Sequence, residues 1–173
     1  DAFAADWVTT IVCPYTDAAN LATLKDACDA RFGPIVQKDA AAIMFSGLGY
    51  SGLSTLGLSQ NSEHFCTLGV PGVPNADWEV AGELAGIVSF HGQIDPARPF
   101  KTLQFKQILP PAETAWLDET ERNLLVMDGI SSAHVPEGAT ELTIEYLATM
   151  YRKNSQGFDD PSQRRLNVRL IHT

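Results

Sequence analysis

Three short apolar segments in the first half of the chain constrain its fold more than any other feature. Residues 41–46 are apolar at all but the last position, and residues 7–13 and 64–70 are rich in β-branched, aromatic and aliphatic side chains. Strands that are apolar throughout and alternate with helices are typical of a parallel sheet covered on both faces. The sequence therefore predicts an α/β fold over residues 1–92, with a mainly parallel or mixed sheet flanked by helices.

Helical patterns fill the intervals between these strands. Asp17 is a good N-cap for a helix that extends to residue 32. A shorter helix, weakened by two glycines, is expected over 51–60. Asn75 is expected to cap the strongest helix, which runs to residue 91 with an apolar stripe along one side. Trp78 belongs to that stripe, so core packing is the expected role of its side chain.

The pattern changes in the second half of the chain. Residues 93–112 form a Pro-rich link, because prolines at two separate places deny it ladder and helix hydrogen bonds. A short helix over 118–127 and a β-hairpin around 136–139 are expected after it. Residues 113–173 are therefore predicted to be a smaller β-containing portion, with a C-terminal segment at its end.

The charge of the chain argues against a nucleic-acid partner. It has 12 basic and 21 acidic residues and a net charge of −9, whereas binding to a phosphate backbone requires clustered Lys and Arg. The basic cluster of Arg164, Arg165 and Arg169 fits a solvated or subunit-contacting face better than an anion site. No stretch approaches the roughly 20 apolar residues that span a bilayer, so no membrane partner is expected either.

The cysteines do not indicate a metal site or redox chemistry. Cys13, Cys28 and Cys66 are far apart, form no C-x-x-C pair and have no histidine at ligand spacing. They are predicted to be structural thiols in a reducing cytoplasm. No Ser-His-Asp set or carboxylate pair stands out from its neighbours. We therefore expect no cofactor, no metal and no enzymatic activity.

One glycine-rich loop is compatible with a different class of function. Gly47, Gly49 and Gly52 form a G-x-G-x-x-G pattern between a strand and a helix, as in loops that bind a dinucleotide pyrophosphate. The pattern follows the second predicted strand instead of the first, and the next strand ends without an acidic residue to hold a ribose. A tight turn is the favoured interpretation, and a nucleotide-binding α/β enzyme is the alternative.

Several segments resemble the tail sheath proteins of Mu-like bacteriophages, and together they extend over nearly the whole chain. The segments are PYTD (14–17), RFGP (31–34), NADWE (75–79), DPARP (95–99), LPPA (109–112), ERNLL (121–125), DGI (128–130), MYR (150–152) and DPS (160–162). These are packing and turn motifs, so they indicate a family without marking an active site. The run from Ser46 to Ser59 and the segment 163–166 depart from the family pattern.

The resemblance implies a structural subunit of a contractile tail sheath. Such a subunit polymerises helically around the tail tube and contracts to drive the tube through the host envelope. Its implied partners are other sheath subunits, the tail tube protein and the baseplate. It would be made in the cytoplasm of the bacterial host and would reside in the virion. A subunit of a phage-derived injection particle is equally compatible with the sequence.

Sheath proteins of this family are considerably longer than 173 residues, so the chain is expected to be a fragment of one. Alone, it should be a monomer or a weak oligomer. Arg98, Arg122, Arg164 and Arg165 are the predicted subunit contacts. The tryptophans, among them Trp116, are further candidates because this residue is enriched at binding hot spots.

Overall fold

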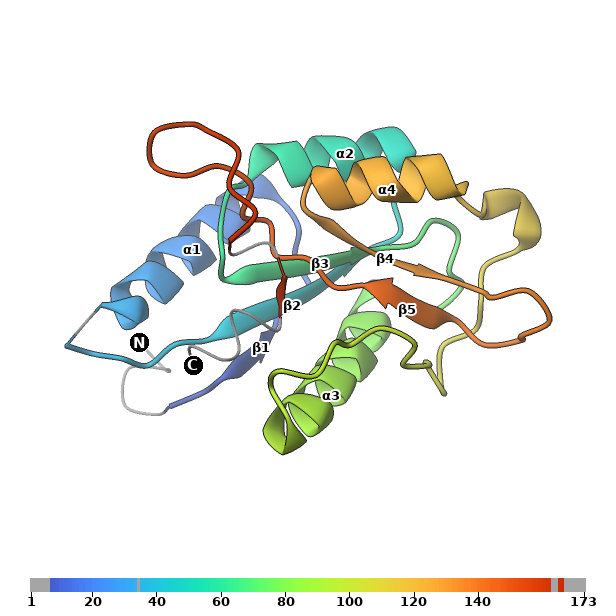
Figure 1. Cartoon of the computed structure of the whole chain (residues 1–173), viewed down its shortest axis with the longest axis horizontal. Coiled ribbons are helices and arrows are strands. Elements are labelled where there is room, and N and C mark those ends of the chain that lie inside the picture. Colours follow the sequence, from blue (N-terminus) through green and yellow to red (C-terminus); the bar gives the residue numbers. More distant parts are fainter. Residues whose placement is uncertain (1–6, 34, 163–164, 167–173) are drawn as a thin grey trace.

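The computed structural model describes residues 7–33, 35–162 and 165–166. It contains five strands, one 3₁₀ turn and four α-helices within those residues (Figure 1). In chain order the elements are β1 (Thr10–Val12), α1 (Ala18–Phe32), β2 (Ala41–Ser46), α2 (Tyr50–Ser59), β3 (Phe65–Gly69), α3 (Asp77–Ile94), η1 (Glu113–Ala115), α4 (Glu119–Met127), β4 (Ile130–His134) and β5 (Thr143–Tyr146).

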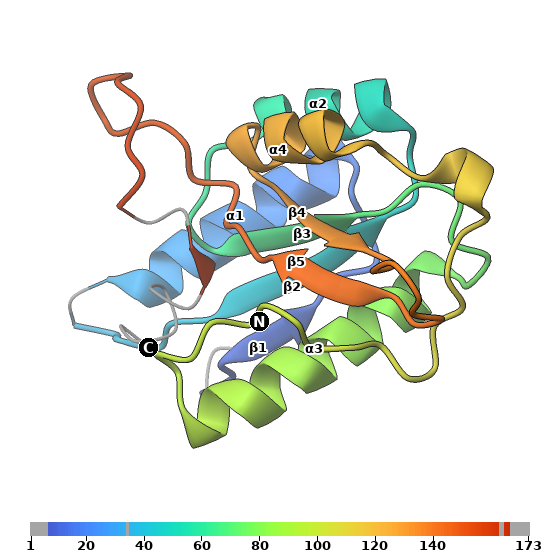
Figure 2. The same cartoon turned by 45° about the vertical axis from the view of Figure 1, so that its right-hand side comes forward.

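The strands form one sheet in the order β1-β2-β3-β4-β5. The first four strands are parallel, and β5 returns antiparallel to β4 as the second arm of a hairpin at the edge of the sheet (Figure 2). The predicted α/β fold with a mixed sheet is therefore confirmed. Every residue of β2 and β3 is buried, which explains why these segments are apolar or small throughout and do not alternate.

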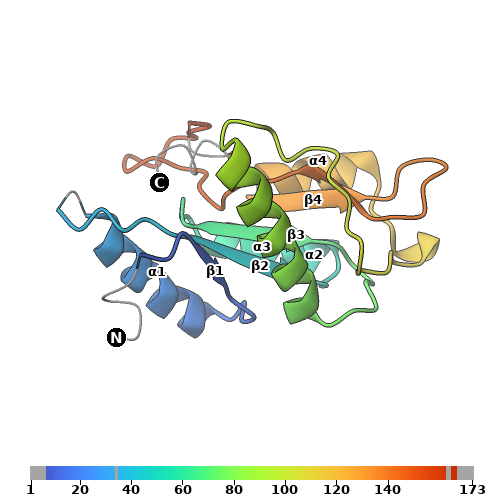
Figure 3. The ribbon, with the colours of Figure 1, turned by 90° about the horizontal axis from the view of Figure 1, so that it is seen from below.

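Helices cover both faces of the sheet (Figures 1 and 3). α1, α2 and α4 pack on one face, where Leu21, Leu53 and Leu125 meet the buried side chains of the strands. Right-handed crossovers between successive parallel strands explain why α1 and α2 share this face. The longer connection from β3 to β4 crosses the opposite face with α3 before α4 returns to this one. α3 lies on the opposite face and forms the second half of the core.

The Pro-rich region is packed against the sheet. Phe100 and Phe105 are buried in the core on the α3 side. The main chain also pairs with the outer side of β5, since the amide of Ile144 donates to the carbonyl oxygen of Leu103 at 2.8 Å. The regions before and after the link therefore contribute strands to the same sheet, and the link itself covers part of the sheet edge.

Capping side chains fix the beginnings of two helices, and the sequence predicts the first of these caps. Asp17 accepts a hydrogen bond from the amide of Asn20 at the start of α1. Asp118 accepts one from the amide of Glu121 at the start of α4, and the Glu121 carboxylate accepts from the Asp118 amide in return. The predicted cap of α3 is wrong by one residue: Ala76 is the N-cap, and Asn75 accepts from a distant amide instead.

The expected core role of Trp78 is also wrong, because its side chain is 64% exposed. The buried stripe of α3 contains Val80, Leu84 and Val88. At about 100° per residue, Trp78 lies roughly a quarter turn from the centre of that stripe. Its apolar character therefore contributes to the outer surface of α3 and not to the core.

A glycine allows α2 and α4 to approach closely on their shared face. A Cβ atom at Gly57 would lie 2.5 Å from the carbonyl oxygen of Asp128, just after α4, and 3.0 Å from a side-chain carbon of Ile130. Nearby, the Ser54 hydroxyl donates to the Asp128 carboxylate at 2.6 Å.

No helix within the described residues is both long and apolar enough to cross a membrane.

Candidate functional site

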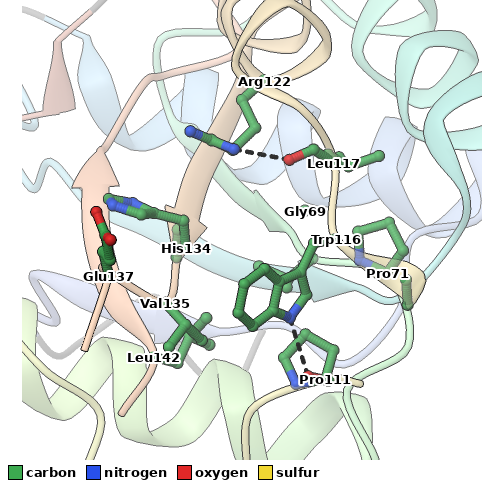
Figure 4. Close-up of a pocket in the computed structure, with 13 residues that line it drawn as sticks. Gly69, Pro71, Pro111, Trp116, Leu117, Arg122, His134, Val135, Glu137 and Leu142 are labelled. Atoms are coloured by element: carbon green, nitrogen blue, oxygen red, sulfur yellow. Dashed lines mark hydrogen bonds between the residues drawn. The ribbon is translucent and has the colours of Figure 1, made fainter. Parts of the chain in front are cut away.

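An apolar pocket opens where the parallel strands β3 and β4 end (Figure 4). Its volume is about 320 Å³, and most of its wall is apolar. Trp116 forms one side of it and is 45% exposed. The indole Nε1 donates to the carbonyl oxygen of Pro111 at 3.0 Å, which fixes the orientation of the ring. The pocket is thus a preformed apolar hollow that can receive a side chain or a small apolar group.

Arg122 closes the pocket on the α4 side. Its Nη1 donates to the carbonyl oxygen of Leu117 at 2.7 Å, and its Nε donates to the Glu145 carboxylate at 2.8 Å. Burial acts to raise the pKa of Glu145, but hydrogen bonding and charge from Arg122, with help from His134, hold it below its ordinary value. The charge of Arg122 is therefore paired with that of Glu145, and its side chain is held in one orientation. It forms part of the pocket wall and does not offer an unpaired positive charge.

A larger groove lies on the other side of Arg122. Its volume is about 800 Å³, and it runs between α4 and β5. Arg165 borders this groove and lies over the ring of Tyr146, with its Cζ 5.8 Å from the ring centroid. Its Nε donates to the Tyr146 hydroxyl at 3.3 Å. Lys101 from the Pro-rich region adds a second exposed cation to the border of the groove.

Two of the predicted contact residues, Arg122 and Arg165, therefore border one groove although they are far apart in sequence. Arg98 lies elsewhere, beyond the end of α3, with its Nη1 3.4 Å from Nδ1 of His91. Arg164 lies outside the described residues. Glu145 and Tyr146 were not among the predicted site residues, because a single outward acid and a single aromatic in a short strand give no pattern that marks them.

The glycine-rich loop between β2 and α2 has a packing explanation. Gly49 is the N-cap of α2, and a Cβ atom at Gly52 would lie 3.0 Å from Cβ of Leu48. The absence of a side chain at Gly52 therefore leaves room for the side chain of Leu48 in the same turn. In the part of the chain that the structure describes, no cluster of three or more His, Cys, Asp or Glu residues is arranged to hold a metal ion. The nucleotide-binding alternative gains no support.

No disulfide joins Cys13, Cys28 and Cys66. Cys66 is fully buried in β3 next to the Ser131 hydroxyl, with 3.4 Å between the sulfur and oxygen atoms. Burial raises the pKa of this thiol to about 12, although the Ser131 hydroxyl acts to lower it. The thiolate, which is the reactive form, is therefore scarce at neutral pH.

Comparison with known proteins gives one curated relative. The chain is 33% identical over 158 residues to the Mu-like prophage FluMu tail sheath protein of Haemophilus influenzae, a match that covers 91% of this chain. The chain is related to Mu-like tail sheath proteins. The predicted resemblance is thereby confirmed. The chain spans about a third of the length of this curated relative, 32% of which is matched. No protein-family model matches it.

Two solved structures share the fold of this sheath-related chain. The sheath tail protein of Desulfitobacterium hafniense superimposes with a TM-score of 0.69 at 10% identity, covering 99% of this chain and 38% of that one. A chain in the cryo-EM structure of the anti-feeding prophage baseplate superimposes with a TM-score of 0.57 at 14% identity, covering 95% and 42% of the two chains. At these identities the likeness concerns the fold alone.

Proposed function

We propose that the protein carrying this chain is a structural subunit of a contractile tail sheath, and that it is not an enzyme. It polymerises helically around a tail tube and contracts to drive the tube through the host envelope. Other sheath subunits, the tail tube protein and the baseplate are its partners. It is made in the cytoplasm of the bacterial host and is incorporated into the virion.

The observation that carries this proposal is the 33% identity to a tail sheath protein over nearly the whole chain. The fold that the chain shares with the sheath tail protein of Desulfitobacterium hafniense is compatible with this function. The architecture also suits a subunit that must transmit force as one body. The central strands β2 and β3 are buried along their whole length between two layers of helix. Close-packed interiors of this kind have low compressibility and transmit strain.

Within this function, the groove between α4 and β5 is the surface that we assign to subunit contact. It combines a preformed hollow with the exposed cations Arg165 and Lys101, beside the carboxylate of Glu119 and the Arg122–Glu145 pair, while the chain as a whole carries a net charge of −9. A neighbouring subunit of the same composition offers many carboxylates to these cations. Trp116, on the far side of Arg122, provides an aromatic anchor of the kind that is enriched at interfaces.

Electron microscopy of the full-length protein that carries this chain tests the proposal. Expressed alone, it should form hollow tubes or striated sleeves in negative stain, because a head-to-tail contact that does not close produces a helical polymer. The 173-residue chain, imaged beside it, should form none. A full-length protein that stays a discrete particle across salt and protein concentration would refute the assignment.

Charge reversal tests the groove within the same assay. Arg165→Glu in the full-length protein is expected to reduce the number of sleeves, because it places a carboxylate where acidic partners dock. Lys153→Glu is the matched control, since Lys153 is also exposed but lies outside the groove. Equal sleeve formation by both variants would show that the groove is not a subunit contact.

A further inference from the structure

A histidine at the end of β4 has one ring nitrogen that is buried without a hydrogen bond. The Nδ1 atom of His134 is shielded from solvent and bonds to no described residue. The side chain as a whole is 34% exposed and lines the apolar pocket beside Trp116 (Figure 4). Water can therefore reach the ring from the pocket, while Nδ1 itself faces the interior of the protein.

The buried nitrogen lies close to a carboxylate that is already in use. Nδ1 of His134 is 3.9 Å from Oε2 of Glu145, which is beyond hydrogen-bond distance. The same oxygen accepts a hydrogen bond from Nε of Arg122 at 2.8 Å. A proton on Nδ1 of the neutral ring would be a buried donor without an acceptor, which is unfavourable. The neutral ring therefore keeps its proton on Nε2 and turns a bare nitrogen toward Glu145.

Protonation of the ring changes what this nitrogen can do. The second proton is added at Nδ1, and a small rotation of the ring lets it donate to the Glu145 carboxylate as a charge-assisted hydrogen bond. Charged groups reach the ring from three elements: Glu145 from β5, Arg122 from α4 and Glu137 from the exposed turn after β4. Two of the three are anions, so these surroundings accept a positive ring.

The carboxylate stays charged while the histidine takes up its proton. Burial acts to raise the pKa of Glu145, but hydrogen bonding and charge from Arg122 hold it below its ordinary value of 4.5. Histidine changes its charge between about pH 5 and pH 8. The protonated ring of His134 therefore meets an anion, and Glu145 loses its charge only at a more acid pH.

Arg122 connects this event to both hollows of the surface. Its side chain borders the pocket and the groove between α4 and β5. One of its bonds goes to the carbonyl oxygen of Leu117 and the other to Glu145. When Glu145 also binds the protonated ring, its hold on Arg122 weakens and the bond to Leu117 remains. The wall between pocket and groove then carries one more positive charge.

We propose that His134, Glu145 and Arg122 form a pH-sensitive switch in the wall between the pocket and the groove. Above the titration range of the histidine, the ring is neutral and Glu145 holds Arg122 alone. Below it, Glu145 is shared by two cations and the wall gains a positive charge. Resting on the proposed sheath function, with the groove as a subunit contact, acidification strengthens the attraction of the groove for an acidic neighbouring subunit.

NMR of the 173-residue chain between about pH 8 and pH 5 tests the switch without any partner. The Nε–H resonance of Arg122 should shift with the same midpoint as the ring resonances of His134. The substitution His134→Asn should abolish this shift. His91→Asn is the matched control, because His91 lies beside Arg98 at the end of α3, outside the pocket and the groove. An Arg122 resonance that ignores His134, or that shifts equally in His134→Asn, would overturn the proposal.

Removing the carboxylate tests the middle member of the switch. Glu145→Gln should move the midpoint of the His134 titration to lower pH by about one unit, because the protonated ring loses its anion and Arg122 is left uncompensated. An unchanged midpoint would contradict the switch. Circular dichroism at neutral pH checks that the variants are folded. If Glu145→Gln is not, His134→Asn decides alone, because it leaves the Arg122–Glu145 pair in place.

Sleeve formation by the full-length protein tests the regulatory consequence. Acidification over the same range should increase the number of sleeves, His134→Asn should remove this dependence, and His91→Asn should retain it. A dependence that is equal in His134→Asn and the unmodified protein would overturn the regulatory role. A full-length protein that forms no sleeves at any pH would refute the sheath function and leave the titration of the chain unaffected, so the two proposals fail separately.

Discussion

The same substitution should have opposite effects on stability at two helical glycines. Gly57 in α2 faces the end of α4, where a Cβ atom would lie 2.5 Å from a main-chain carbonyl oxygen of Asp128. Gly86 in α3 faces outward, where a Cβ atom would meet nothing within 4 Å. Alanine therefore tests packing at one position and helix propensity alone at the other.

The magnitudes follow from these surroundings. Gly86→Ala should raise the free energy of unfolding by about 0.5–1 kcal/mol, because alanine loses less backbone entropy in a helix. Gly57→Ala gains a similar amount but must push α2 away from rigid main chain. Overpacking against a rigid carbonyl costs about 1–3 kcal/mol, so the net change should be a loss of up to about 2.5 kcal/mol.

Urea and thermal unfolding, followed by circular dichroism and tryptophan fluorescence, measure both variants at a concentration where the chain is monomeric. For a chain of this size, about 1 kcal/mol corresponds to a change of roughly 2–4 °C in Tm. The expected result is a higher Tm for Gly86→Ala and a lower one for Gly57→Ala. Shifts of the same sign in both variants would refute the close approach of α2 to α4, or the open surroundings of α3.

Three further outcomes are expected. Because the native pKa of Glu145 lies below its ordinary value of 4.5, its pairing with Arg122 stabilises the fold fully above that pH and is lost as pH falls through the native pKa. Glu145→Gln should therefore cost about 1 kcal/mol near neutral pH and flatten the acid limb of the stability curve. A thiol reagent should label Cys13, which is partly exposed, well before Cys66, whose pKa is about 12, and labelling both at one rate in native buffer would contradict the burial. Asp118→Ala should lower the free energy of unfolding by about 1 kcal/mol in urea titrations, because it removes the cap of α4.

Local signals predicted the fold well wherever neighbouring residues decide the structure. Asp17 caps the helix that the sequence assigned to it, since a capping bond spans only three residues, and the short helix expected over 118–127 matches α4. The segment 41–46 matches β2, because a strand buried on both faces is recognisable from its composition. The sequence also predicted the hairpin around 136–139.

Features that depend on distant partners could not be predicted in the same way. Trp78 shares the spacing of a core stripe, and only the angle at which α3 meets the sheet decides that it faces outward. Asn75 resembles a cap, but a distant amide, that of Leu109, takes its side-chain oxygen. For the same reason, the sequence could not predict which residues share the groove between α4 and β5. Arg122 and Arg165 were predicted separately, and their shared groove exists only because β5 and α4 lie side by side.

The pairing of β3 with β4 has a consequence for how the chain holds together when its backbone is cut. Thr67 and Ile130 are neighbours in the sheet although the whole Pro-rich region lies between them in sequence. Residues 95–99 in that region include an exposed turn next to α3, where a protease can reach the main chain. A single cut there leaves every strand of the sheet in place. The two fragments should remain bound as a nicked complex that separates only in denaturant, and fragments made separately should reassemble when mixed.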